Sequence, residues 1–321
     1  MISESPLSNQ PAGQAAPAEP ERLEIACQSC GATIVLQPQS LTAICPFCAS
    51  PSVLQRPASP DLPTPHFVVG FSINQDRAAR LVRQWISKSH WFARSDFKKT
   101  APELTRGVYL PAYLYGAIAD ASYAAEIGEN YTETETYTTT NSEGKTVTRT
   151  RTVTKTEWRT LHGNYSCYVL DVLVTASRGV SNPALEAIEP FDLRTLRRFA
   201  PSLVSGWLAE APTRSEQDCF SLAHDEAMTK VSENLAGMMP GDSHRNLRHQ
   251  AKMTREVIDL VLLPVWTFAV RYAEDQPPVQ ILVNGQTGRV GGDVPVSGKK
   301  IAAVTLVALA LIAVLAWLFT R

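Results

Sequence analysis

Four of the six cysteines form two C-x-x-C pairs that are separated by fourteen residues. The pairs are Cys27 with Cys30 and Cys45 with Cys48. Each pair can form a tight turn that directs two thiolates at one ion, and a strand and turn between the pairs would close a tetrahedral site of four thiolates. Gly31 suits the left-handed position after such a turn. The spacing therefore predicts a zinc site made of these four cysteines.

Two other kinds of chemistry use the same residues. Iron can occupy four thiolates, and C-x-x-C pairs can act as redox dithiols, but a redox pair normally begins a helix within a βαβ pattern. Here the flanking stretches LEIA, TIVL and SVLQ are typical of short strands. Four thiolates leave no open coordination position, so we expect the zinc to be structural and not catalytic. A segment this short has too little core to fold alone, so metal binding would supply much of its folding free energy.

The charge pattern argues against nucleic-acid binding by this module. Residues 23–55 contain one charged side chain, Glu24, and no Lys or Arg, and the whole chain has a net charge of −1. Phosphate contacts, the main source of nucleic-acid affinity, need cations. Phe47 lies between the second pair of cysteines and could stack on a base or pack internally. We expect protein contact or structural support in preference to nucleic-acid binding.

No other residues show a catalytic pattern. The six histidines, at 66, 90, 162, 224, 244 and 249, lack metal-ligand spacing. His224 precedes Asp225 and Glu226 in a predicted helix, where adjacent side chains point apart, so a surface position is expected. Cys167 and Cys219 are interpreted as buried thiols. The phosphate-binding and nucleophile motifs are absent from the sequence. The sequence therefore predicts a protein that is not an enzyme and offers no small-molecule substrate.

The last part of the chain has the composition of a membrane span. Residues 301–320 are twenty consecutive uncharged residues, which as a helix would be about 30 Å long, the thickness of a hydrocarbon core. Lys299, Lys300 and Arg289 precede the span. The positive-inside rule then leaves the N-terminal bulk in the cytoplasm. We expect a single-pass, tail-anchored protein of the bacterial inner membrane.

The rest of the chain divides by composition. Residues 1–21 have the composition of a disordered tail, residues 22–55 form the predicted zinc ribbon, and residues 56–66 form a Pro-rich linker. Residues 67–298 are predicted to be an antiparallel α+β domain.

Two segments of that domain resemble each other and predict an internal duplication. Val108, Leu110 and Pro111 recur as Val261, Leu263 and Pro264, and helices are expected before both, over 74–92 and 215–238. The alternative is chance similarity. Proline within a strand indicates an edge or a bulge.

Residues 131–157 alternate Thr with charged or aromatic residues around an Asn/Gly turn, which predicts a β-hairpin. Glu133 and Glu135 on one strand would face Arg149, Arg151 and Lys155 on the other. Neither face is apolar, so we expect this hairpin to project into water. Our hypothesis is a partner-docking arm, and the alternative is a solvated insertion.

Several motifs together resemble an uncharacterised bacterial family. They are the cysteine pairs, the terminal apolar stretch, and the segments Pro190–Leu193, Ser205–Trp207, Leu263–Trp266 and Val283–Val290. Members of that family are membrane proteins with an N-terminal TFIIB-type zinc ribbon, and some are labelled as related to primosomal protein N′, a replication-restart helicase. The resemblance implies zinc ligation by the four cysteines and no catalytic residue. A helicase needs a phosphate-cradling loop that this sequence lacks.

These observations predict a membrane-anchored adaptor or assembly factor with a protein partner. The alternative is a membrane-tethered nucleic-acid-binding protein linked to DNA replication, for which the ribbon is the argument. An enzyme with an unfamiliar site is a third hypothesis.

Overall fold

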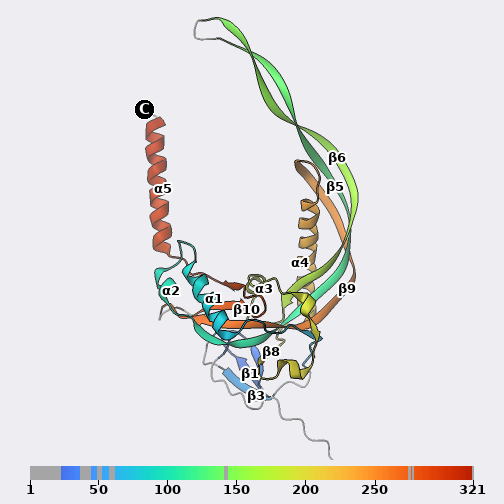
Figure 1. Ribbon diagram of the computed structural model, residues 1–321, viewed down its shortest axis with the longest axis vertical. Helices are drawn as coiled ribbons and strands as arrows, with labels where there is room; N and C mark the ends of the chain where they lie inside the picture. Colours follow the sequence, from blue (N-terminus) through green and yellow to red (C-terminus); the bar gives the residue numbers. More distant parts are fainter. Residues whose placement is uncertain are drawn as a thin grey trace, which may run out of the picture.

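The computed structural model describes residues 23–36, 45–48, 53–57, 62–140, 144–273, 276 and 278–319. The predicted tail over 1–21 lies outside them, as do residues 58–61 of the predicted linker. The chain has a mixed α+β fold, as predicted, with one large sheet (Figure 1). The strands are β1 (Leu23–Cys27), β2 (Thr33–Leu36), β3 (Val53–Pro57), β4 (Phe67–Val68), β5 (Glu103–Thr140), β6 (Thr146–Thr175), β7 (Arg197–Arg198), β8 (Leu208–Ala211), β9 (Ser243–Val270), β10 (Val279–Asn284) and β11 (Val290–Gly292). The helices are α1 (Gln75–Ser87), α2 (Ser95–Lys99), α3 (Asn182–Glu186), α4 (Glu216–Gly237) and α5 (Gly298–Phe319), with 3-10 turns at Leu193–Thr195 and Pro201–Val204.

The two amphipathic helices begin at side-chain caps. Asn74 accepts a hydrogen bond from the backbone N–H of Arg77 at the start of α1, and Ser215 accepts one from Asp218 at the start of α4. Residues spaced by four along α4 are fully buried, namely Cys219, Ala223, Ala227, Val231 and Leu235. The predicted first helix extended to Phe92, but α1 ends at Ser87, and the chain then forms a loop before α2.

The two similar segments lie beside each other as the antiparallel central strands β5 and β9, with Leu110 opposite Leu263. The strands on the outer sides of β5 and β9 begin to pair at positions that are also 153 residues apart, the separation between Val108 and Val261. β8 runs parallel to β5 from Val108, and β4 runs parallel to β9 from Phe67 opposite Val261. β6 then pairs with β5 from Ala112 onward, and β10 pairs with β9 from Val265 onward.

Pro111 and Pro264 lie in these central strands, so the prediction of an edge or a bulge at them was wrong. Each proline lies where the outer neighbour changes, from β8 to β6 and from β4 to β10. Their carbonyls point outward and accept hydrogen bonds from Ala176 and Gly285. Proline has no N–H group to donate. On each strand the side that lacks the N–H points to the gap between the two outer neighbours, so no hydrogen bond of the sheet is lost there.

The central sheet and the elements that pack on its two faces, together called the base, form three layers. One face of the sheet carries the aromatic residues Tyr113 and Tyr115 under α4, and Trp266 and Phe268 in the cluster with α1. The opposite face carries Leu110, Leu263 and their neighbours against the cysteine segments and α3. The helices α1 and α4 therefore share one face, and the four cysteines lie on the other.

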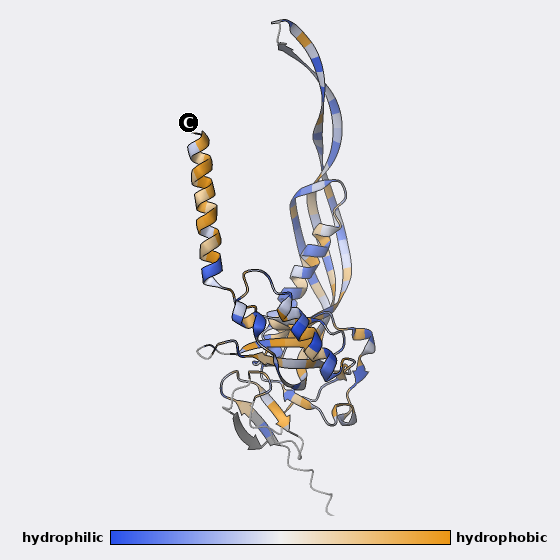
Figure 2. Ribbon diagram, turned by 60° about the vertical axis from the view of Figure 1, so that its left-hand side comes forward, coloured by the Kyte–Doolittle hydropathy of each residue, from blue (hydrophilic) through white to orange (hydrophobic). Residues whose placement is uncertain are grey.

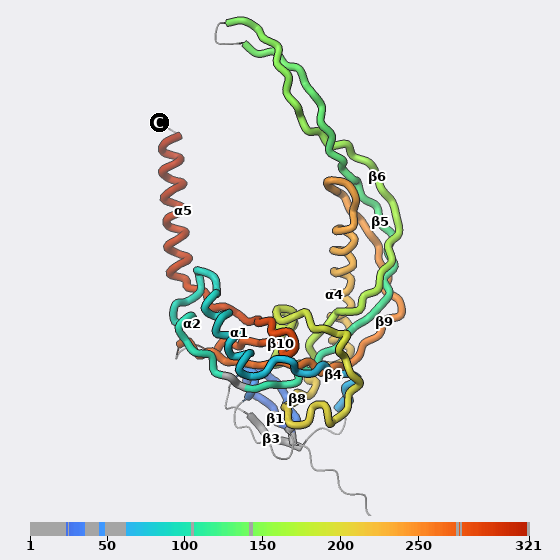
Figure 3. The backbone as a smooth tube through the Cα atoms, viewed as in Figure 1, coloured from blue at the N-terminus to red at the C-terminus, as the bar shows by residue number. Residues whose placement is uncertain are grey.

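β5 and β6 continue beyond the base as one long hairpin (Figures 1 and 3). β9 accompanies β5 as far as Gly128, opposite Ser243, and from there the arm, defined as residues 129–140 and 146–157, has two strands. The predicted hairpin over 131–157 is thus the far end of a much longer ladder, and its turn residues 141–143 lie outside the described part. Five pairs of directly opposed threonines occupy one face of the arm: 132 with 154, 134 with 152, 136 with 150, 138 with 148, and 140 with 146.

α5 stands apart from the other helices and corresponds to the predicted span over 301–320, of which Thr320 lies outside the described residues. The helix is long and apolar enough to cross a membrane, and none of its residues is buried. Figure 2 shows that the residues of α5 are almost all hydrophobic, whereas those of the arm are mostly hydrophilic.

Candidate metal centre

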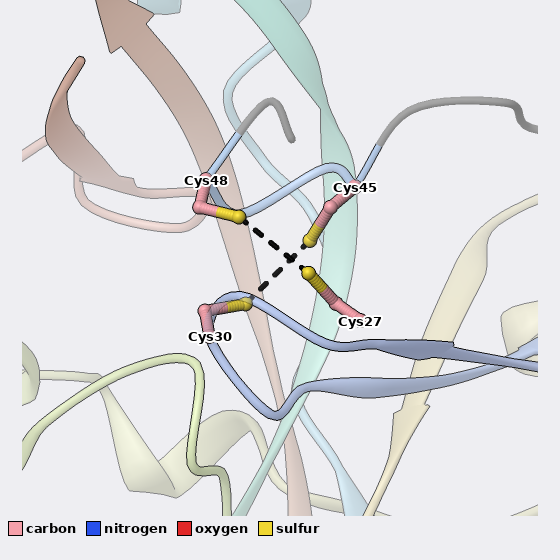
Figure 4. Close-up of side chains that lie close together, drawn as sticks. All are labelled: Cys27, Cys30, Cys45 and Cys48. Carbon is pink, nitrogen blue, oxygen red and sulfur yellow. Dashed lines mark hydrogen bonds between the residues drawn. The ribbon is translucent and has the colours of Figure 1, made fainter. Parts of the chain in front are cut away.

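The four predicted ligands come together at one point. Cys27 Sγ lies 3.6 Å from Cys48 Sγ, and Cys30 Sγ lies 3.6 Å from Cys45 Sγ, so each close pair joins one C-x-x-C turn to the other (Figure 4). All four sulfur atoms lie within 4.8 Å of one another. Within the described residues this is the group of His, Cys, Asp and Glu side chains placed to hold a metal ion.

The spacing of the sulfur atoms fits a metal ion. A tetrahedral ion with metal–sulfur bonds of about 2.3 Å places its ligands about 3.8 Å apart. The observed separations of 3.6 Å lie close to that value. Four thiolates also form the soft donor set that thiophilic ions prefer. The four cysteines could therefore hold one ion with only small side-chain adjustments.

Backbone hydrogen bonds shape the first turn. The N–H of Cys27 donates to the carbonyl of Ala32, and the N–H of Gly31 donates to the carbonyl of Cys27. Gly31 has a φ of +77°, as the sequence predicted, because the chain must reverse between β1 and β2. The turn thereby points both sulfur atoms of the first pair toward the second pair.

The local electrostatics favour a thiolate at Cys45. Cys30 and Cys45 share a proton between their sulfur atoms, and the N–H groups of Cys48 and Phe47 donate to Cys45 Sγ, and these hydrogen bonds lower the pKa of Cys45. The pKa of Cys30 is raised, first because its proton is held in that hydrogen bond and then because it is buried. These N–H groups remain available to stabilise negative sulfur when an ion replaces the shared proton.

The second turn is fixed to the large sheet by side chains that sequence analysis did not find. Thr267 Oγ1 on β9 donates to the carbonyl of Pro46 at 2.6 Å, and Gln280 Nε2 on β10 donates to the carbonyl of Phe47 at 3.0 Å. Phe47 is fully buried. Its ring packs in the core and is not available to stack on a base. In sequence, Thr267 and Gln280 are ordinary strand residues, and nothing in their spacing links them to the cysteines.

The strands around the cysteines belong to the same sheet. Thr33 of β2 lies opposite Ala211 of β8, which in turn runs beside β5. Gly179 permits close packing here, because a Cβ at this position would lie 2.8 Å from Ala32 Cβ. The cysteine segments are therefore a corner of a much larger fold.

A buried acid on β8 lies close to this corner. Glu210 on β8 is 3% exposed, and its Oε1 accepts a hydrogen bond from Ser177 Oγ at 2.6 Å. Its Oε2 has no hydrogen-bond partner among the described residues. Burial raises the pKa of Glu210 to about 8, and the nearby Cys45 adds to the effect. The carboxyl group is therefore protonated at neutral pH.

Within the described part of the chain, the other candidate residues lie outside the four-cysteine cluster. His224 Nδ1 lies 2.8 Å from Glu256 Oε2, which also accepts a hydrogen bond from the buried hydroxyl of Tyr115. Through this contact His224 joins α4 to the sheet, and its side chain is partly exposed. Cys219 is buried as predicted, whereas Cys167 is only half-buried.

Comparison with known proteins gives one distant relative and no established function. The chain is 25% identical over 240 residues to "Uncharacterized protein YdjG" of Bacillus subtilis (strain 168). The alignment covers 74% of this chain and 66% of that protein, just under two thirds of its length. No family model matches the chain. No solved structure matches it either. The replication-restart helicase label therefore has no support from these comparisons.

Proposed function

We propose that this chain is a non-enzymatic, single-pass protein of the bacterial inner membrane that holds a structural zinc ion and binds a protein partner on the cytoplasmic face. The observation that carries the proposal is the closed four-sulfur cluster, built into the corner of a large sheet. Zinc has no redox chemistry, and four thiolates complete its coordination. The same sulfur geometry would accept iron, so the identity of the metal is settled by measurement.

Membrane anchoring rests on α5. Residues 301–319 are all exposed, and a free helix of this composition would be insoluble in water. Lys299 and Lys300 lie at the start of α5, next to the part of the chain that precedes it. By the positive-inside rule they favour a cytoplasmic location for that part, which we call the body.

The direction of α5 must change on insertion. In the structure α5 and the arm rise from the base in the same direction (Figures 1 and 2). A bilayer around α5 in that pose would meet the long hairpin of β5 and β6 (Figure 1), whose charged side chains are costly in hydrocarbon. α5 buries no residue against the body, and a Cβ at Gly298 would have nothing within 4 Å. We infer that α5 turns about Ser297 and Gly298 to place the arm in water.

The arm is the proposed partner-binding element. It carries a neutral threonine face, and its other face bears Glu133 and Glu135 paired with Lys155 and Arg151. These cations are neutralised within the arm, and Phe47 is buried, so the nucleic-acid alternative gains no support from either region. The matched registers of the two halves also support the duplication, which we retain as part of the proposal.

Crosslinking in native membranes tests the proposed role. Residues 131–155 are replaced by Asn-Gly, so that the paired Asn130 and Thr156 are joined by a two-residue turn. The shortened chain is expected to keep its metal and its membrane association but to lose the partner that the full chain captures. Capture of the same partner by the shortened chain would contradict the proposal.

A matched variant separates the charges of the arm from its length. Glu133→Gln, Glu135→Gln, Arg151→Gln and Lys155→Gln together leave the net charge unchanged and the hairpin intact. Loss of the partner in this variant assigns recognition to the charged face, and retention assigns it to the threonine face.

A further inference from the structure

The loop between α1 and α2 leaves two large aromatic side chains in solvent. Trp91 is 62% exposed and Phe92 is 37% exposed, and their ring centroids lie 5.3 Å apart. The same segment buries Ala93 and Phe97 completely. The loop is therefore firmly placed, and its fold directs the two rings outward. Exposed neighbouring aromatic rings mark interaction sites, and tryptophan is the residue most suited to the membrane–water interface.

The loop is fixed to the segment that leads into α5 and to Lys300 in the first turn of the helix. The N–H of Ser297 donates to the carbonyl of Phe92 at 2.8 Å, and the N–H of Arg94 donates to the carbonyl of Pro295 at 2.9 Å. Lys300 Nζ reaches across to the carbonyls of Trp91 and Ala93 at 3.0 and 2.8 Å. Because these contacts hold the loop beside the start of the apolar helix, the two rings must lie at the level where α5 enters the bilayer.

The surface around the rings is positively charged. Residues 88–99 and 293–300 contain six cations and two carboxylates. Of the carboxylates, Asp96 is paired with Arg94 at 2.7 Å, and Asp293 lies at the far end of the second segment. Lys88, Lys99 and Lys299 are exposed, and none of them forms an ion pair with a residue in the described part of the chain. This charge complements anionic lipid headgroups.

We propose that Lys88, Trp91, Phe92, Lys99, Val296 and Lys299 form a lipid-facing patch that binds the surface of an anionic bilayer and holds the body against the membrane. The proposal rests on the membrane anchoring proposed above and adds a second contact with the bilayer. The aromatic rings and Val296, which is 53% exposed, enter the headgroup region, and the lysines remain in water beside the phosphates. Pivoting of α5 at Gly298 keeps the hydrogen bonds of Ser297 with Phe92 and of Pro295 with Arg94, which hold the two rings beside Val296, whereas Lys299 and Lys300 move with the helix.

Vesicle flotation of a chain that ends at Lys300 tests the patch without the apolar residues of α5, because this chain keeps Lys299 and the contacts of Lys300 with the loop. This chain loses no packing, because α5 has no buried residue. It is expected to float with vesicles of phosphatidylcholine and phosphatidylglycerol, to bind phosphatidylcholine alone at least tenfold more weakly, and to be released as salt rises. Trp91→Ser with Phe92→Ser should weaken binding to the anionic vesicles by about tenfold or more. Lys88→Gln with Lys99→Gln should weaken it by about 25-fold, at roughly fivefold per lysine.

Matched controls keep the result interpretable. Arg197→Gln with Arg198→Gln removes two exposed cations from β7, outside the patch, and should leave binding unchanged. All variants alter exposed residues, so the metal content and melting temperature should stay at the values of the parent chain. Equal binding to both kinds of vesicle, or binding unaffected by the patch variants, would overturn the proposal. A change from dimer to monomer in the aromatic variant, without a change in lipid binding, would make the patch a self-association surface and would also overturn it.

Carbonate extraction of the full chain separates the two claims. Retention of the full chain in the membrane, with no vesicle binding by the chain that ends at Lys300, would reject the patch alone. Release of the full chain by carbonate would reject the span proposed for α5, whatever the flotation result.

Discussion

The two ends of β5 follow different physical rules although they belong to one strand. Near the base, Val108–Tyr115 is buried on both faces, by the helices on one side and by the cysteine corner on the other. At the far end, Tyr131–Thr140 has one partner strand and is mostly exposed. A continuous pair of strands can therefore join a buried core to a hairpin that is stabilised only by contacts between its own two strands.

The energies of the two ends differ accordingly. Burial at the base removes whole side chains from water, at about 1.5–3 kcal/mol for each large apolar one. In the arm the ion pair of Arg151 with Glu135 involves side chains 63% and 34% exposed, and exposed pairs contribute only about 0–1 kcal/mol. Threonine pairs add about 0.2–1 kcal/mol each. The base thus supplies stability, and the arm supplies a surface.

Loss of the metal should produce the largest effect. Cys45→Ser removes a buried ligand beside the sheet core, so we expect loss of the bound metal and destabilisation by several kcal/mol, since metal binding contributes to folding. Metal analysis and thermal unfolding measure both effects. The half-buried Cys167 provides the control, because Cys167→Ser should keep the metal and most of the stability. A metal-free Cys45→Ser variant with an unchanged melting temperature would contradict this expectation.

Truncating one aromatic ring at each end should give the next largest contrast. Phe47→Ala empties a fully buried position and should cost about 3–5 kcal/mol. Tyr137→Ala in the arm removes a ring that is 42% exposed and should change stability by no more than about 0.5 kcal/mol. Denaturant unfolding of the two variants measures the difference. Equal losses of unfolding free energy in the two variants would show that the arm unfolds together with the core.

Glu210 predicts a pH dependence that is confined to the base. Its pKa is about 8 in the folded chain against 4.5 for the ordinary group, so between these values the folded state keeps a proton that the unfolded state has lost. Stability should therefore fall as pH rises through this window, by up to about 1.4 kcal/mol per pH unit. Glu210→Gln imitates the protonated acid, so its advantage over the parent should grow from pH 5 to pH 8. An advantage that stays constant with pH would mean that Glu210 is ionised when folded.

The smallest effect is expected from the ion pairs of the arm. Glu135→Gln removes a carboxylate that Arg151 and Lys155 both contact, yet all three side chains are about one third or more exposed. We expect less than about 1 kcal/mol of change in stability. Hydrogen exchange of the arm amides, measured with and without 0.5 M salt, should show a modest loss of protection in both the variant and the salt-treated parent. A loss as large as that of Phe47→Ala would contradict the division between the two ends.

Sequence patterns predicted the features that depend on local spacing. The two C-x-x-C pairs, Gly31 in its left-handed turn, the helix α4 and the hairpin of alternating threonines are all set by residues close together in the sequence. The contacts of Thr267 and Gln280 with the second cysteine turn could not be found this way, because they join residues more than 200 positions apart. The length of β5 was also missed, because its alanine-rich middle lacks the alternation that marks the arm.

Metal analysis combined with X-ray absorption on the purified chain decides whether the four cysteines hold zinc. We expect one zinc ion per chain with four sulfur ligands at about 2.3 Å, and protection of Cys27, Cys30, Cys45 and Cys48 from thiol reagents until the metal is removed. A metal-free folded protein in which these four thiols react freely, or a metal with nitrogen or oxygen ligands, would contradict it.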